Sequence, residues 1–278
     1  MDKHSHTIGI LGAGNMGGAI AAALASDTTW KVSVYNTDPA KSRALQEQYP
    51  TLDIARTTES LVKTSSIVLL AVKPQVLPAL YADLRKYALP ETNWISIAAG
   101  VSLSTLTEQL ASRNVIRFMP NMAATVKASV TAVCPAPDAP QTFIDDAKTL
   151  AEAFGEAFIM KESDMPAFIG ISGSAIAYHL QFLHNLAMAG THQGIPYSTA
   201  LALSQVTAHG AIELLKNTGR NPMELAVSVC SAGGTTIEGM KALAENGFES
   251  AVYQAVAATA EKSRTMEILA RLPAGAEK

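Results

Sequence analysis

The first half of the chain alternates short apolar runs with segments whose apolar residues recur at helical spacing. Apolar runs of this length, bounded by polar residues or glycine, are typical of buried strands in a parallel sheet. Regular alternation of strands with helices predicts an α/β fold with a doubly wound sheet. The expected strands span residues 7–11, 31–36, 66–72, 94–98, 115–119, 129–134 and 157–160, and the expected helices 19–25, 104–110 and 143–154.

The second half shows helical spacing alone. Asn221 and Pro222 form a helix start, and Asn246 and Gly247 form a helix end. We therefore divide the chain into two domains, an α/β domain over residues 1–162 and an all-helical domain over residues 163–278. The helices expected in the second domain span residues 169–194, 197–216, 222–229, 235–245 and 248–272, and residues 273–278 are expected to form a frayed tail.

The helical domain is rich in small residues, which let helices pack closely and leave them apolar on more than one face. Examples are Ala200, Ala202, Ala208, Gly210 and Ala211. Because such faces need to be covered, we expect a homo-oligomer built on this domain, with a compact monomeric bundle as the alternative.

Composition narrows the class of protein. Of the 278 residues, 48% are apolar and 16% are charged, which indicates a folded chain with a sizeable core. The net charge of −3 and the lack of a basic run argue against a nucleic-acid partner. Cys134 and Cys230 have no metal spacing, residues 1–6 are polar, and every apolar stretch is too short to span a bilayer. We expect a cytoplasmic protein without a metal or a membrane partner.

The first expected strand ends in a glycine-rich turn that leads into a helix. Gly12 permits a tight turn, Gly14 lets a pyrophosphate approach the backbone, and Gly17 lets the helix pack on the strand. We therefore predict a dinucleotide site and a Rossmann-like domain, with a glycine-rich packing turn as the alternative.

The end of the second strand bears on the choice of cofactor. An NAD enzyme usually carries an acid there, whereas this chain has the neutral Asn36, which favours NADP because an acid would repel a 2′-phosphate. The acidic Asp38, two residues later, weakens the case for NADP. Lys41 and Arg43 follow on the next helix, where they either bind the phosphate or belong to a solvated helix face.

Two further strands end in polar residues. Residues just past the strand ends of an open α/β sheet line its ligand crevice, which places Lys73 and Asn121 there. The alternatives are a surface lysine and a turn asparagine. The helix after the strand at 94–98 carries Thr105 and Glu108 at capping-box spacing, which predicts its start.

Residues 230–237, Cys-Ser-Ala-Gly-Gly-Thr-Thr-Ile, lie between two expected helices. Two glycines let a ligand approach the backbone, and the following helix start offers free N–H groups, which suits a small anion such as a carboxylate. The alternative is a helix–helix turn capped by serine and threonine. No set of histidines, cysteines or paired carboxylates with catalytic or metal spacing is present, and hydride transfer to a protonated imine needs none.

Taken together, these motifs resemble those of the pyrroline-5-carboxylate reductase family over essentially the whole chain. The three matching stretches that come last in the chain are, in their order and spacing, the most specific. The matching stretches are residues 12–17 (Gly-Ala-Gly-Asn-Met-Gly), 71–75 (Ala-Val-Lys-Pro-Gln), 98–100 (Ala-Ala-Gly), 117–121 (Arg-Phe-Met-Pro-Asn), 172–174 (Ser-Gly-Ser) with Ala177 and Tyr178, and 231–236 (Ser-Ala-Gly-Gly-Thr-Thr).

The resemblance implies reduction of 1-pyrroline-5-carboxylate to L-proline with NADPH, or with NADH in some members, and a helical dimerisation domain that often builds rings of dimers. It implies that Gly234 and Thr235 offer N–H groups to the substrate carboxylate, that Thr236 acts as the catalytic residue by binding the ring nitrogen, and that Glu162 lies near the pocket. Ser231 and Gly233 complete the implied substrate site. The implied cofactor residues are Leu11, Gly12, Ala13, Gly14, Asn15, Met16, Asn36, Ala71, Val72, Lys73, Pro74, Ala98, Ala99 and Gly100, to which we add Asn121.

The chain departs from the family pattern at several positions. Ala175-Ile176 stands where the family has Gly-Pro, Ala232 replaces a proline, Met122-Ala123 replaces Thr-Pro, and Thr37 stands where an arginine is common. Two other functions stay open. A β-hydroxyacid dehydrogenase would carry a lysine on the first long helix of the second domain, and residues 171–185 contain none. The third possibility is an NADP-binding regulator without catalysis.

Overall fold

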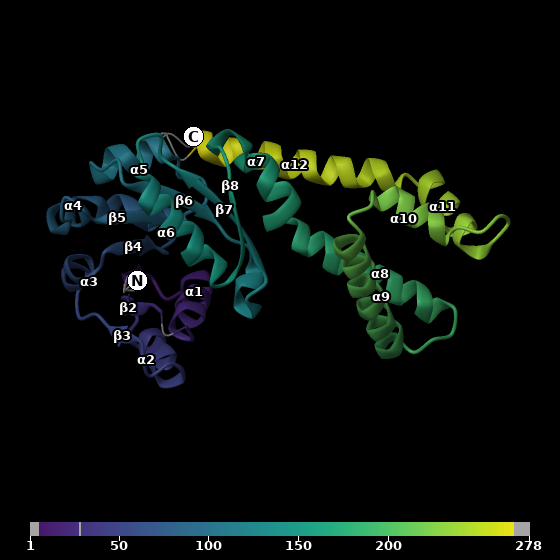
Figure 1. Cartoon of the computed structure of the whole chain (residues 1–278), viewed down its shortest axis with the longest axis horizontal. Helices are drawn as coiled ribbons and strands as arrows, with labels where there is room; N and C mark the ends of the chain where they lie inside the picture. The colour runs from purple at the N-terminus through teal and green to yellow at the C-terminus, as the bar shows by residue number, and fades with distance from the viewer. Residues whose placement is uncertain (1–5, 28, 270–278) are drawn as a thin grey trace. The chain divides into compact units, whose positions relative to one another are not determined.

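A computed structural model describes residues 6–27 and 29–269 of the chain (Figure 1). These residues form two compact units, which are described separately below. The first unit contains the described residues up to Gly173 together with those from Thr259 onward, and the second contains Ser174–Ala258. The predicted division after residue 162 falls before the short helix Met165–Phe168, whose Met165 and Phe168 belong to the core of the first unit. The two compact units thus divide at a later residue than 162, and the domain boundary after residue 162 stays a prediction.

An eight-stranded sheet forms the centre of the first unit (Figure 1). Its strand order is β3-β2-β1-β4-β5-β6-β7-β8, and every neighbouring pair is parallel except β6 and β7. The order runs outward in both directions from β1, which confirms the predicted doubly wound sheet. The strands are β1 Thr7–Leu11, β2 Lys31–Tyr35, β3 Asp53–Ile54, β4 Ile67–Leu70, β5 Asn93–Ser96, β6 Val115–Met119, β7 Ser129–Pro135 and β8 Gly155–Ile159.

Helices cover both faces of this sheet. On one face, Ile8 and Ile10 pack with Ile20 of α1 and Phe143 of α6, and on the other Leu11 packs with residues of α3, α4 and α5. Burial on both faces explains why the strands are continuous apolar runs instead of alternating ones. The helices of this unit are α1 Asn15–Ala25, α2 Pro39–Gln48, α3 Thr58–Thr64, α4 Leu77–Tyr87, α5 Leu103–Leu110, α6 Gln141–Glu152 and α7 Met165–Phe168.

The start of α5 differs from the prediction. Ser102 is the N-cap, and its hydroxyl accepts the N–H of Thr105 at 3.2 Å. The expected capping box of Thr105 and Glu108 is therefore wrong by one turn, because Ser102 lies one turn earlier and has the same capping chemistry.

The second unit consists of helices and contains no strand within Ser174–Ala258. The predicted helix over 169–194 begins later, at Ala175, because one turn of π-helix at Ile169–Gly173 precedes it. Close packing of small residues is visible where a Cβ added to Gly190 would lie 3.2 Å from the Cβ of Ala200. The helices are α8 Ala175–His192, α9 Tyr197–Thr218, α10 Pro222–Val229, α11 Thr235–Glu245 and α12 Phe248–Leu269, of which α12 continues into the first unit. The tail predicted at 273–278 lies outside the described residues.

Candidate active site

The turn after β1 is shaped by glycine. Gly12 has a φ of +110°, donates its N–H to the carbonyl of Tyr35 at 2.8 Å, and leaves no room for a Cβ, which would lie 2.7 Å from the carbonyl oxygen of Ala71. A Cβ at Gly17 would lie 2.1 Å from the carbonyl oxygen of Gly12. Both glycines are therefore needed to bring the start of α1 close to the strand ends, as the sequence predicts.

Gly14 behaves differently and marks the open side of the turn. It is exposed, and a Cβ added there would meet no atom within 4 Å. Gly14 is the N-cap of α1, no side-chain hydrogen bond caps the helix, and the first bond of the helix runs from the N–H of Gly18 to the carbonyl of Gly14 at 2.7 Å. The N–H groups of Asn15, Met16 and Gly17 thus face an open helix start, which fits a pyrophosphate.

Asn36 ties the end of β2 to this turn. Its side-chain oxygen accepts the N–H of Ala13 at 2.9 Å, and its amide donates to the carbonyl of Asp38 at 3.0 Å. The carboxylate of Asp38 accepts the N–H of Ala40 at 3.0 Å and caps α2. The acid that argued against NADP in the sequence is therefore engaged as a helix cap.

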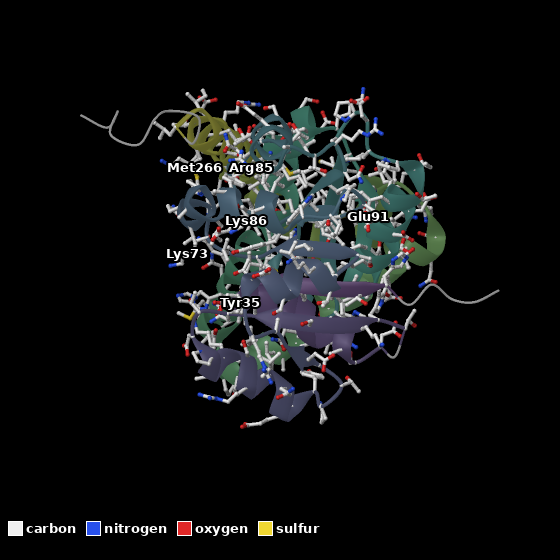
Figure 2. The ribbon with its side chains drawn as sticks, turned by 90° about the vertical axis from the view of Figure 1, so that its left-hand side faces the viewer. Tyr35, Lys73, Arg85, Lys86, Glu91 and Met266 are labelled. Carbon is white, nitrogen blue, oxygen red and sulfur yellow. The ribbon has the colours of Figure 1, made fainter. Side chains whose placement is uncertain are left out.

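The other predicted cofactor residues follow the strands that neighbour β1. The N–H of Ala71 donates to the carbonyl of Leu11 at 2.9 Å, which joins the segment after β4 to the end of β1. Lys73 is exposed, and Figure 2 shows it on the same side of the unit as Tyr35 from the end of β2. The segment Ala98–Gly100 follows β5 at the same edge of the sheet. The sheet thus brings the predicted residues 11–16, 36, 71–74 and 98–100 to one edge.

Asn121 is buried at the end of β6. Its side-chain oxygen accepts the N–H of Ala123 at 3.2 Å, and its amide donates to the hydroxyl of Ser172 at 3.2 Å. The turn role that we considered for Asn121 is therefore present. The same side chain also joins the end of β6 to the π-helical turn at Ile169–Gly173, both of which lie in the motifs quoted above.

Arg117 is a residue that sequence analysis did not single out. It lies in the middle of β6, is 0% exposed, and forms ion pairs with Glu162 and Glu267, each at 2.9 Å. Glu162 also accepts the N–H of Leu103, the first residue of α5, at 2.7 Å. The signal was the charged residue itself, since a lone arginine within an apolar run has to be paired when buried.

This cluster fixes the segment that follows β5. Glu162 holds the start of α5, and Glu267 on α12 is held by the same arginine. A Cβ added to Gly100, whose φ is +77°, would lie 3.7 Å from the carbonyl oxygen of Met266, which is labelled in Figure 2. The predicted cofactor segment Ala98–Gly100 is therefore bordered by the last turns of α12.

Cys134 lies opposite Arg117 in the register of β6 and β7. Burial raises the pKa of its thiol to about 12, although the charge of Arg117 acts in the opposite direction. Cys134 therefore stays protonated at neutral pH and is not a nucleophile.

In the second unit, residues 230–236 form the turn between α10 and α11. Gly233 has a φ of +66°, the N–H of Gly234 donates to the carbonyl of Ser231 at 3.0 Å, and Gly234 is the N-cap of α11. No side-chain hydrogen bond caps α11, so the interpretation as a turn capped by serine or threonine is wrong. The helix start is left with open N–H groups, and Ser231, Gly233 and Thr235 are exposed while Thr236 is half-buried.

Other chemistry is not found in the described part of the chain. No group of three or more His, Cys, Asp or Glu residues there is able to hold a metal ion. No described helix is long and apolar enough to cross a membrane. The nucleotide-type turn and the start of α11 are the two uncapped helix starts that directly follow a glycine and that lie in the predicted binding motifs.

Comparison with known proteins gives two matching family models. The model described as pyrroline-5-carboxylate reductase dimerisation matches residues 162–266, and the model described as NADP oxidoreductase, coenzyme F420-dependent, matches residues 7–100. The pyrroline-5-carboxylate reductase of Escherichia coli is 33% identical over 263 residues, which cover 93% of this chain and 97% of the relative. That of Synechocystis sp. is 35% identical over 262 residues, which cover 93% and 97%.

Solved structures of pyrroline-5-carboxylate reductases also match this chain. The crystal structure of pyrroline carboxylate reductase from Plasmodium falciparum with NADP bound matches with a TM-score of 0.83 and 27% identity, covering 94% of this chain and 98% of that one. The 1-pyrroline-5-carboxylate reductase from Streptococcus pyogenes matches with a TM-score of 0.82 and 30% identity, covering 94% and 99%.

Proposed function

The chain belongs to the pyrroline-5-carboxylate reductase family, and we propose that the two features described above bind the cofactor and the substrate of that reaction. The protein is an oxidoreductase that reduces 1-pyrroline-5-carboxylate to L-proline, the last step of proline biosynthesis, and it uses NADP(H). The assignment of individual residues is our proposal.

The cofactor site lies at the carboxyl edge of the sheet in the first unit. The N–H groups of residues 15–17 hold the pyrophosphate, because α1 begins without a side-chain cap and Gly14 leaves the approach open. The segments 71–74 and 98–100, together with Asn121, line the remainder of the site. When bound, the nicotinamide supplies the hydride. Because Asn36 is neutral and Asp38 is engaged as a cap, we expect NADPH to be preferred over NADH.

The substrate site lies at the start of α11. The observation that supports it most is the lack of a side-chain cap on this helix, together with the glycines that precede it. The N–H of Thr235 binds the carboxylate, and the hydroxyl of Thr236 binds the ring nitrogen. The N–H of Gly234, which the resemblance also implied for the carboxylate, is instead engaged within the turn. Ser231 and Gly233 shape the turn, since the carbonyl of Ser231 accepts the N–H of Gly234.

The role of these residues is to bind and to orient. The ring imine is reduced as its protonated form, so the carbon receives a hydride and the nitrogen already carries its proton. The protein then contributes by holding the ring and by stabilising its charge, which is why no acid–base pair is needed.

Self-association belongs to the same proposal. Apolar side chains are exposed on α8 and α9, among them Leu180 at 58% and Val206 at 73%. Faces of this kind need a partner, and the family model that covers the second unit is described as a dimerisation domain. We propose a dimer through the second unit, further assembly into a ring of dimers, and a cytoplasmic location without nucleic-acid or membrane partners.

The Thr236→Val variant tests the assignment of the substrate site. Valine keeps the shape of threonine and removes the hydroxyl, so we expect kcat/KM for pyrroline-5-carboxylate to fall about tenfold or more, on the order of 1–3 kcal/mol. Thr149→Val is the matched control, because the hydroxyl of Thr149 only donates to the carbonyl of Asp145 on the surface of α6. Equal kinetics of Thr236→Val and Thr149→Val would exclude the proposed role of Thr236.

A further inference from the structure

Arg56 follows β3 at the same edge of the sheet as the proposed cofactor site. In the register of β2 and β3, Val34 pairs with Ile54, and the N–H of Ala55 donates to the carbonyl of Val34 at 3.0 Å. Asn36 and Arg56 each lie two residues beyond that pair. Because neighbouring strands are about 4.8 Å apart, the two residues are neighbours where the strands end.

The acidic side chains near the end of β2 are already engaged, and the cation Arg56 has no acidic partner among the described residues. The carboxylate of Asp38 is engaged by the N–H of Ala40. Glu59 is paired with Lys63 at 2.6 Å, and the hydrogen bond from that lysine, followed by its charge, lowers the pKa of the Glu59 carboxyl. Arg56 is exposed and forms no hydrogen bond or ion pair with any residue that the structure describes.

The other cations near this edge are less well placed. Lys41 and Arg43 are exposed on α2, on either side of the buried Ser42. Residues two apart on a helix do not face the same way, so the two side chains cannot act together on one ligand. Arg56 instead follows the strand that pairs with β2, next to the residue that sets the ribose end of a dinucleotide site.

We propose that Arg56 binds the 2′-phosphate of NADP(H) and thereby selects NADP over NAD. This inference rests on the proposed cofactor site at residues 11–16. A guanidinium suits the task because its planar fork donates two parallel N–H groups to one phosphate and stays charged at every physiological pH. Asn36 carries no charge and therefore does not repel the phosphate. Its side chain is held in place by hydrogen bonds with Ala13 and Asp38.

Isothermal titration of the full-length protein with NADP+ and with NAD+ tests this role without relying on activity. For Arg56→Gln we expect the Kd of NADP+ to rise roughly 10- to 100-fold while that of NAD+ changes less than about twofold. Arg56→Lys should recover part of the loss. Lys41→Gln and Arg43→Gln are the matched controls, and both should bind NADP+ like the unaltered protein.

Several results would overturn the inference. These are an unchanged Kd of NADP+ in Arg56→Gln, an equal loss in Lys41→Gln or Arg43→Gln, and a parallel loss for NADP+ and NAD+. If the unaltered protein binds neither cofactor, the proposed cofactor site fails along with the inference. Failure of Arg56 alone leaves NADP+ binding intact, which distinguishes the two.

Discussion

Replacement of Arg117 by methionine removes the centre of a buried ion cluster. Methionine keeps an unbranched apolar stem and loses the guanidinium, which pairs with Glu162 and Glu267 at 2.9 Å each. The two carboxylates then lose their common counter-ion while they stay partly buried, at 30% and 17% exposure. The variant is therefore expected to be destabilised through the uncompensated charges more than through lost packing.

The magnitude follows from the burial of the three groups. Removal of one partner from a fully buried pair costs about 3–5 kcal/mol. Because both carboxylates retain some contact with water, the lower end applies, about 3 kcal/mol. For a domain of this size, each kcal/mol lowers the Tm by about 2–4 °C, so we expect a decrease of about 6–12 °C.

The assay is thermal unfolding followed by circular dichroism, at neutral pH and at one fixed protein concentration without cofactor. Arg113→Met is the matched control, because Arg113 is exposed and precedes the same strand. We expect the Tm of the control to change by less than about 1 °C, as for a surface substitution. If Arg117→Met and Arg113→Met melt at the same temperature as the unaltered protein, the cluster does not stabilise the fold as described here.

The glycine-rich turn and the cysteines give two further predictions. Gly17→Ala should lower the Tm, because its Cβ would lie 2.1 Å from the carbonyl oxygen of Gly12. Gly14→Ala should keep the Tm and raise the KM for NADPH, because its Cβ enters open space at the proposed pyrophosphate site. Unfolding curves and cofactor titrations check both, and an equal Tm for the two variants would contradict the packing argument. Iodoacetamide at pH 8 should label Cys230 before Cys134, since burial raises the pKa of Cys134 to about 12 and leaves it protonated and covered. Mass spectrometry of tryptic peptides measures the order, and faster labelling of Cys134 would refute it.

The elements that the sequence predicted best have strong local signals. The strand at Thr7–Leu11 and the helix at Thr235–Glu245 have the predicted bounds, because each is an apolar pattern that ends at glycine or asparagine. Strand β3 was not predicted, since Asp53–Ile54 is too short to show any periodicity. It matters nevertheless, because it brings Arg56 next to the end of β2.

Contacts between distant parts of the chain could not be predicted in the same way. Sequence analysis did not single out Arg117, although it is a charge in an apolar strand, and its partners Glu162 and Glu267 come from much later in the chain. Nothing in the local pattern of residues 248–272 indicates that the last turns of this helix pack on the sheet unit. The start of α8 was missed for a related reason, since the π-helical turn at Ile169–Gly173 preserves the apolar spacing of a helix.

The most direct test of the proposed function is the reaction itself. The purified full-length protein is mixed with 1-pyrroline-5-carboxylate and NADPH, the loss of NADPH absorbance is followed, and the product is identified by chiral chromatography. We predict consumption of NADPH with formation of an equal amount of L-proline, and a rate that falls about tenfold or more in Thr236→Val but not in Thr149→Val. Binding of NADPH without formation of proline would contradict the account.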